Sequence, residues 1–224
     1  MTITAPRQSR PLCADALRNR AKILQAAAEV FAERGLEVTL DDIAHHAGVG
    51  VGTVYRRFAD REALVEALFD DRMKVMLQRM RDAMEDPDPW HGLLGFVEST
   101  CALLASDRGM RQVMLSSTYG QGEVAQCRDE FGILGEQLVT RVKATGMVRP
   151  DFEVTDIFVL FLLIGTVTDF AGEFAPQLWR RYFDIMVDGM RAQPGQDPAP
   201  ALAPTLDKQK LDSAMRCWRP FGRR

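Results

Sequence analysis

The chain of 224 residues has few of the side chains that build metal, redox or disulfide-stabilised sites. It has three histidines and four cysteines, and the cysteines are scattered, at Cys13, Cys101, Cys127 and Cys217. No cysteine pair has Cys-x-x-Cys or metal-ligand spacing, and the adjacent His45 and His46 point in different directions, so they cannot share a metal ion. We therefore expect reduced thiols, no bound metal and no cofactor.

Long apolar runs are also scarce. The most hydrophobic run, Ile157 to Ile164, has eight residues, whereas a helix that spans a bilayer needs roughly 20. The first twenty residues are polar and rich in arginine, unlike a signal peptide. These absences predict a cytoplasmic protein with no membrane partner.

Residues 85–192 contain none of the common catalytic patterns. They have no recognisable pair of catalytic carboxylates, no glycine-rich phosphate loop and no Gly-x-Ser-x-Gly motif, and their one histidine is His91. We therefore do not expect an enzyme, although a helical bundle enclosing a catalytic cavity is an alternative that turnover without DNA binding would favour.

The chain has slightly fewer basic than acidic residues, with a net charge of −3 and a pI of about 5.7. A protein that binds nucleic acid is usually basic overall, but the charge of the docking surface matters more than the total. Basic residues gather in the first part of the chain, at Arg7, Arg10, Arg18, Arg20, Lys22, Arg56, Arg57 and Arg61. A local basic surface is therefore compatible with the acidic total.

The apolar residues of the sequence recur mainly with helical periodicity, and no strand pattern appears. Apolar residues recur at spacings of three and four from Leu17 to Phe31, which predicts a helix that ends at Gly35. Thr39 and Asp42 have the form of a capping box, so a second helix begins there and ends at Gly48.

A third helix is expected over Val51 to Phe58, with Val54 and Phe58 facing inward. Asp60 then caps a fourth helix that ends before the prolines at 87 and 89. Its apolar stripe consists of Leu64, Leu68, Met73, Met76, Met80 and Met84. Five further helices are expected at about 90–105, 107–116, 122–145, 153–171 and 176–192.

These patterns predict an all-α fold of about nine helices. A flexible arm (1–14) precedes a three-helix, homeodomain-like helix-turn-helix domain (15–62), and a helical effector-binding and dimerisation domain (63–192) follows. The proline-rich residues 193–224 are expected to be disordered, although Lys208–Trp218 could form a turn or two of helix.

Two short helices joined by a glycine-containing turn have the layout that presents a helix to the major groove of DNA. With Val54 and Phe58 buried, the exposed side of the third helix carries Thr53, Arg56 and Arg57 next to the small Gly52. Arginine donates bidentate hydrogen bonds to guanine, so this face is suited to reading bases.

The stretch RAKILQAAAEVFAERGLEVTLDDIAHHAGVGVGTVYRRFADREALVEALFDDRM resembles the DNA-binding domain of the TetR family along its whole length. The matching features are the first helix ending FAERG, the Thr39 cap, DDIA at 41–44, AGV at 47–49 and Gly-Thr-Val-Tyr-x-x-Phe at 52–58. The resemblance implies that Thr39 and Tyr55 contact phosphates. It also implies that Thr53 and Arg57 read bases, with Arg56 beside them.

The resemblance has three departures. Arg61 stands where the family usually has a phosphate-contacting lysine, and Gly50 and Val51 replace the usual serine and lysine. We expect the arm arginines and Arg61 to supply more of the affinity as a result, and Val51 could contact a thymine methyl group.

The helix expected at 153–171 is apolar nearly all round, so its burial needs more neighbours than one small domain supplies. We therefore expect an obligate homodimer formed through this helix and the one at 176–192, an arrangement that the resemblance also implies. A two-fold dimer would read palindromic double-stranded operator DNA with half-sites about 34–36 Å apart.

The resemblance further implies a cavity for a small-molecule effector in the second domain. Its candidate lining residues are Met76, Met80, Phe96, Thr100, Cys101, Leu104, Met114, Phe131, Leu134 and Thr166. The expected function is that of a repressor released from its operator by a small, largely apolar ligand. A ligand-independent regulator or an activator of the same fold is the alternative.

Overall fold

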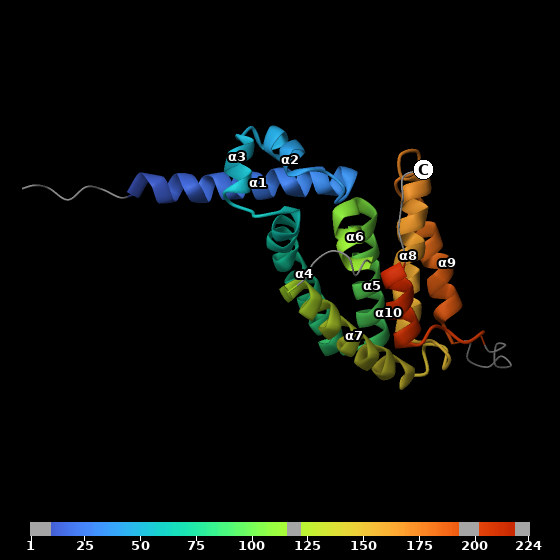
Figure 1. Ribbon diagram of the computed structural model, residues 1–224. Coiled ribbons are helices and arrows are strands. Elements are labelled where there is room, and N and C mark those ends of the chain that lie inside the picture. Colours follow the sequence, from blue (N-terminus) through green and yellow to red (C-terminus); the bar gives the residue numbers. More distant parts are fainter. Residues whose placement is uncertain (1–9, 116–121, 193–201, 218–224) are drawn as a thin grey trace, which may run out of the picture.

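The computed structural model describes residues 10–115, 122–192 and 202–217 (Figure 1), and these residues form ten helices. The helices are α1 (Arg10–Arg34), α2 (Leu40–Ala47), α3 (Val51–Tyr55), α4 (Arg61–Glu85), α5 (Pro89–Ser106), α6 (Arg108–Leu115), α7 (Gly122–Lys143), α8 (Val154–Ala171), α9 (Leu178–Met190) and α10 (Lys208–Cys217). Outside the helices, Val148 and Arg191 form an isolated bridge. The expectation of an all-α fold is confirmed.

The helix-turn-helix domain is built from α1, α2 and α3. Figure 1 shows α2 and α3 on one side of the long α1, while α4 leads away from it toward the remaining helices. The two parts are joined by aromatic packing, because the rings of Phe31 on α1 and Phe69 on α4 stack 6.3 Å apart. Both rings are fully buried, so the DNA-binding domain shares its core with the larger domain.

The helix boundaries differ from the sequence-based expectation at three places. First, α1 begins at Arg10, so residues 10–14 of the expected arm are helical. Pro11 is compatible with this start, because a proline in the first turn of a helix removes no hydrogen bond. Residues 1–9, which include Arg7, lie outside the described residues.

Second, α3 ends at Tyr55 rather than at Phe58. The N–H groups of Arg57 and Phe58 both donate to the carbonyl oxygen of Val54, at 2.9 Å each. This shared acceptor tightens the last turn and ends the regular helix. Third, the tail expected to be disordered contains α10 at Lys208–Cys217.

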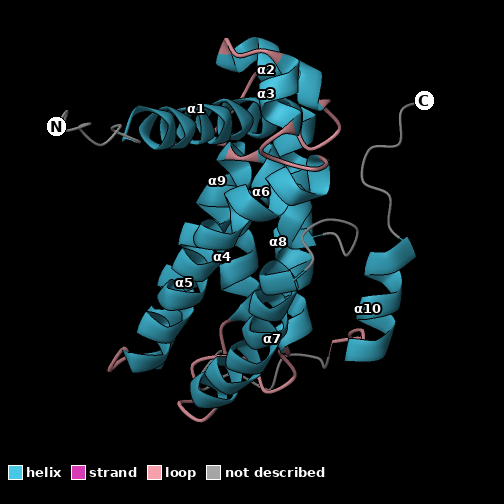
Figure 2. Ribbon diagram, turned by 60° about the vertical axis from the view of Figure 1, so that its left-hand side comes forward, coloured by secondary structure: helices cyan, strands magenta, loops and turns pink. Residues whose placement is uncertain are grey.

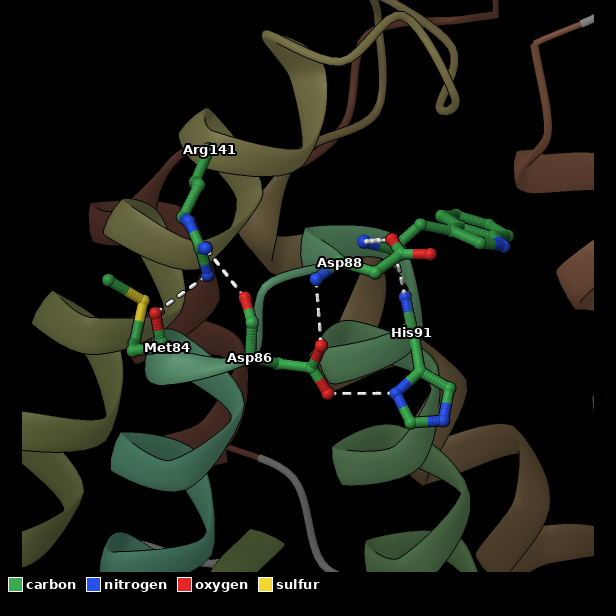
Figure 3. A network of polar contacts seen from close by, with 6 residues as sticks. Met84, Asp86, Asp88, His91 and Arg141 are labelled. Atoms are coloured by element: carbon green, nitrogen blue, oxygen red, sulfur yellow. Dashed lines mark hydrogen bonds and ion pairs between the residues drawn. The ribbon is translucent and has the colours of Figure 1, made fainter.

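The end of the bundle far from the DNA-binding domain is held by a polar network at the α4–α5 corner (Figure 3). Arg141 of α7 donates to the carbonyl oxygens of Met84 and Asp86, at 2.6 Å each. Asp88 caps α5 by accepting from the N–H groups of Trp90 and His91. The network therefore ties α4, α5 and α7 together where two prolines interrupt the helices.

Helix α8 is more apolar than the eight-residue run suggested. Over Val154–Ala171 its mean hydropathy is 1.9, so by length and composition alone it could cross a membrane. A core helix of a soluble protein passes the same test, and α8 packs against α5 and α9 with Leu160, Ile164 and Gly165 buried.

Candidate nucleic-acid interface and ligand cavity

The start of α2 is fixed by the capping box that the sequence predicts. The hydroxyl oxygen of Thr39 accepts from the Asp42 N–H at 3.1 Å, and an Asp42 carboxylate oxygen accepts from the Thr39 N–H at 3.0 Å. The hydrogen bond from the Thr39 side chain, followed by that from its backbone, lowers the pKa of Asp42. Thr39 therefore has a role in positioning α2, and its exposed side chain also lies at the domain surface.

The turn between α2 and α3 requires glycine at position 48. Gly48 has φ 63° and ψ 34°, in the left-handed region that residues with a Cβ rarely adopt. The N–H of Val49 donates to the Ala44 carbonyl at 3.0 Å, which closes the end of α2. Gly50 then precedes α3, and its carbonyl accepts from the Thr53 N–H at 2.7 Å.

Helix α3 has one buried and one exposed side. Val54 is completely buried and Phe58 nearly so, whereas Val51, Tyr55, Arg56 and Arg57 are exposed. Tyr55 exposes 51% of its surface, so its hydroxyl is available to a ligand outside the protein. Gly50 and Gly52 are also exposed. Because glycine has no side chain, the backbone at these two positions is directly accessible.

Thr53 is half-buried and accepts a hydrogen bond from Arg56 at 3.1 Å, so these two predicted DNA-contacting residues contact each other. Arg61 is also half-buried, and it donates to the carbonyl oxygen of Leu36 at 3.1 Å. Its guanidinium thus anchors the α1–α2 loop to the start of α4, a role that sequence reasoning did not find.

Helix α6 connects the DNA-binding domain to the larger domain through polar contacts that sequence reasoning also missed. Gln112 accepts from the backbone N–H of Leu36 at 2.5 Å, next to the carbonyl held by Arg61. At the start of α6, Asp107 forms an ion pair of 2.6 Å with Arg72 of α4. Arg111, which is buried, forms a partly buried ion pair of 2.7 Å with Asp169 of α8. These contacts join α8, α4 and the DNA-binding domain through one short helix.

The larger domain contains a partly open cavity of about 490 Å³ between α4, α5, α7 and α8, with α10 on its outer side. Its lining includes four of the residues expected from the sequence, Met80, Phe96, Met114 and Phe131. The rings of Phe96 and Phe131 lie 6.0 Å apart and form one apolar wall. A largely apolar cavity of this size suits a small ligand with a largely apolar body.

The other six expected lining residues lie elsewhere. Met76, Thr100, Cys101 and Leu104 are buried in the core, and Leu134 is half-buried against it. Thr166 is exposed, and its hydroxyl donates to the Leu162 carbonyl at 2.9 Å. Periodicity places such residues on an inward face but cannot separate a cavity wall from solid core.

Several lining residues had no counterpart in the sequence analysis. From α7 the cavity is lined by Ala125, Arg128, Asp129, Gly132, Gly135 and Glu136, whose spacing of three and four is a helical stripe. From α8 it is lined by Val154, Thr155, Ile157, Phe158 and Phe161. Arg128 donates to the Val113 carbonyl at 3.1 Å, and burial lowers its pKa. The α7 stripe was readable from the sequence, but its small and charged residues did not suggest a cavity.

The buried thiols are chemically inert in this fold. Cys101 is completely buried, and desolvation raises its pKa. Burial also raises the pKa of Cys127. Since the thiolate is the reactive form, neither cysteine is suited to sensing oxidants.

A helix-turn-helix domain joined to a helical domain with a largely apolar cavity is the architecture of a class of DNA-binding regulators. The comparisons agree with this class. Residues 23–68 match the family described as bacterial regulatory proteins, tetR family, and residues 88–192 match the SbtR-like transcriptional regulator C-terminal domain. The chain belongs to the TetR family of transcriptional regulators, which are DNA-binding proteins and not enzymes.

Relatives of this chain come from several bacteria. It is 39% identical over 163 residues to an uncharacterized HTH-type transcriptional regulator, YhgD, of Bacillus subtilis, covering 69% of this chain and 85% of the relative. It is 29% identical to the HTH-type transcriptional repressor BepR of Brucella suis, covering 73% and 72% of the two chains. The crystal structure of a TetR regulatory protein from Mycobacterium vanbaalenii is similar at 31% identity and a TM-score of 0.50, covering 81% of this chain and all of that one.

Proposed function

We propose that this protein is a cytoplasmic repressor that binds a palindromic operator as a homodimer and releases it when a small, largely apolar ligand enters the cavity. The observation that carries the DNA-binding part is the exposed face of α3, where Tyr55, Arg56 and Arg57 project beside two glycines while Val54 anchors the helix. The similarity to a named repressor supports the direction of regulation.

Within this interface we assign separate tasks to the side chains. Arg57, and Thr53 with Arg56 beside it, would face the base edges in the major groove. Thr39 and Tyr55 would contact phosphates, with Arg61 behind them, and Gly50, Val51 and Gly52 would allow the backbone to come close to the duplex. Phosphate contacts set the register and base contacts set the sequence preference.

The dimer would form through α8 and α9. These helices lie side by side at one edge of the molecule (Figure 1), and they carry large exposed apolar side chains. Leu163 and Phe170 on α8, and Tyr182 and Ile185 on α9, are between 40% and 84% exposed. Several large apolar side chains exposed on two adjacent helices indicate an interaction surface.

Ligand release would act through α6. A ligand that displaces α4 or α8 also moves the contacts of Asp107 and Arg111, and Gln112 passes that movement to Leu36. To convert a population from 1:99 to 99:1, the ligand must prefer the released state by about 10⁴-fold, or roughly 5.5 kcal/mol.

The test is gel retardation of the DNA upstream of the protein's own gene, with unrelated DNA as competitor. Arg57→Ala should weaken specific binding by about 1–3 kcal/mol, or roughly 5- to 150-fold, and relax the sequence preference at one position. Arg79→Ala, which removes an exposed arginine from α4, is the matched control and should bind as the wild type does. Absence of any sequence-specific retardation by the wild type at low salt would refute the operator-binding proposal.

A further inference from the structure

We propose that α10 is a lid that completes the outer wall of the ligand cavity and closes over its occupant. This inference rests on the proposed function, in which the cavity holds a small apolar ligand. Both family matches end at or before residue 192, so the lid is a feature of this chain beyond the matched domains. Figure 2 shows α10 as a separate helix set apart from the helices of the bundle.

Among the described side chains of α10, two apolar residues one helical turn apart face the cavity. Leu211 and Met215 are half-buried, and both line the cavity. Gln209, Lys210 and Ala214, on the other faces of the helix, are exposed. An i, i+4 apolar pair on an otherwise polar helix is the pattern of a helix that lies on an apolar surface.

The residues before α10 form a strap that is tied to the start of α8. The backbone N–H of Leu202 donates to the Asp151 carboxylate at 2.8 Å. The hydroxyls of Thr205 and Thr155 are hydrogen-bonded at 3.1 Å. Thr155 is buried and itself lines the cavity, so the strap places the base of α10 at the cavity's edge.

The strap is anchored more firmly than the helix. Arg149 holds Asp151 through two hydrogen bonds of 2.9 and 3.0 Å, and it keeps the pKa of Asp151 far below its usual value. Asp207 begins α10 by accepting from the Lys210 N–H at 2.8 Å. By contrast, α10 touches the cavity mainly through Leu211 and Met215. A firm strap and a narrow apolar contact allow the helix to swing away without unfolding the core.

With α10 in place the cavity still measures about 490 Å³, so the helix covers the space and does not fill it. A ligand inside would gain contact with Leu211 and Met215, and movement of α10 would remove that contact and speed the ligand's release. Because the coupling is reciprocal, a ligand that is held by α10 must also hold α10 in place.

The experiment uses the full chain and the neutral apolar dye Nile red as the probe. The test variant is Leu211→Asp/Met215→Asp, which places charge on the inner side of α10. The matched control is Gln209→Asp/Ala214→Asp, which adds the same charge to exposed positions of the same helix. Stopped-flow fluorescence gives the rate at which the dye dissociates, and hydrogen exchange reports the protection of α10.

The test variant should release the dye about tenfold faster than the wild type, equal to about 1.4 kcal/mol if association is unchanged. The control should release it at the wild-type rate. In the wild type, bound dye should slow amide exchange in 208–217. Gly132→Trp, which adds a side chain where no atom lies within 4 Å of the new Cβ, should abolish dye binding.

Equal dissociation rates for the test variant and the control would overturn the lid, as would α10 amides that exchange like those of an unstructured peptide. Tighter dye binding by the test variant would also overturn it, because α10 would then compete with the ligand. Dye binding that survives Gly132→Trp would place the dye elsewhere and would count against the lid. If the wild type binds no dye, both the lid proposal and the proposal of an apolar ligand are refuted. Gel retardation tests operator binding separately.

Discussion

At the scale of single residues, charged side chains in this protein hold backbone groups at the places where helices begin or end. Arg61 and Arg141 donate to carbonyl oxygens of the α1–α2 loop and the α4–α5 corner. Asp60 and Asp88 accept from N–H groups at the starts of α4 and α5. Such contacts satisfy the polar groups that a helix end leaves unpaired, so the corners of the fold are sensitive to changes in charge.

The His91–Asp86 pair at the α4–α5 corner should make one of these corners sensitive to pH (Figure 3). Asp86 lies 2.8 Å from Nδ1 of His91 and raises the pKa of the imidazole above its usual 6.5. Since the folded-state pKa is raised, the stabilisation is fully present below pH 6.5 and is lost as pH rises through the raised value. The imidazole is largely exposed, so the contribution to stability is small.

Asp86→Asn should return the pKa of His91 toward 6.5, because the amide keeps an acceptor for the Asp88 N–H but loses its charge. The measurement is an NMR titration of the three histidines, with His91→Gln to assign the signal. Glu29→Gln, which removes the partner of His46, is the control and should leave His91 unchanged. A His91 titration that Asp86→Asn does not alter would contradict the assigned cause.

At the scale of helices, the contact between α6 and α1 depends on a residue without a side chain. A Cβ on Gly109 would lie 2.9 Å from the Cβ of Phe31 and 3.0 Å from its carbonyl oxygen. Gly109→Ala should therefore force α6 away from α1 and lower the free energy of unfolding by about 1–3 kcal/mol. Because α6 also carries Gln112, the variant should weaken the link to the DNA-binding domain.

Gly95→Ala is the matched control, because its new Cβ meets no atom within 4 Å on the exposed side of α5. In an open helical position, alanine should raise the free energy of unfolding by about 0.5–1 kcal/mol. The free energies of unfolding of both variants are to be measured by urea unfolding at one fixed protein concentration. If the two alanine variants change stability in the same direction, then the close approach of α6 to α1 is not what constrains Gly109.

Local signals in the sequence were enough to predict most helices, because caps and stops act within a few residues. Thr39 and Gly48 bound α2, and Asp60 begins α4, each through contacts with near neighbours. The link from Leu36 to Gln112 joins residues 76 positions apart, and no periodicity marks it. The sequence allowed a turn or two of helix at Lys208–Trp218, within which α10 lies, but its composition did not show that Leu211 and Met215 would line the cavity.

Local sequence signals were also insufficient to predict which residues line the cavity. Met80, Phe96, Met114 and Phe131 could be proposed because the family resemblance implies a cavity and these residues are apolar. Which apolar residues face empty space is decided by how four helices diverge, and that is a property of packing between distant segments. Exposure of the α3 face was predictable, because it depends on the alternation of buried and exposed positions within one short helix.

At the scale of the whole molecule, the proposed operator binding requires two helix-turn-helix domains held at a fixed distance by a homodimer. One α3 helix reads only a half-site, so a monomer loses the gain from simultaneous engagement of both halves. Phe170 near the end of α8 and Phe174 just after it are 84% and 86% exposed within one chain. Two aromatic rings left exposed at one edge of the chain favour a partner surface that covers them.

Phe170→Asp should therefore produce a monomer whose affinity for the full palindrome falls by about 10²- to 10⁴-fold. A carboxylate at this position would have to enter an apolar interface without a partner. Ile133→Asp, at a 55% exposed position of α7, adds the same charge away from α8 and α9 and should remain dimeric. Sedimentation velocity at micromolar concentration separates the outcomes, since each chain has a mass of 25.1 kDa. A wild type that sediments as a single chain would refute the dimer, whereas a dimeric Phe170→Asp would move the interface to another face.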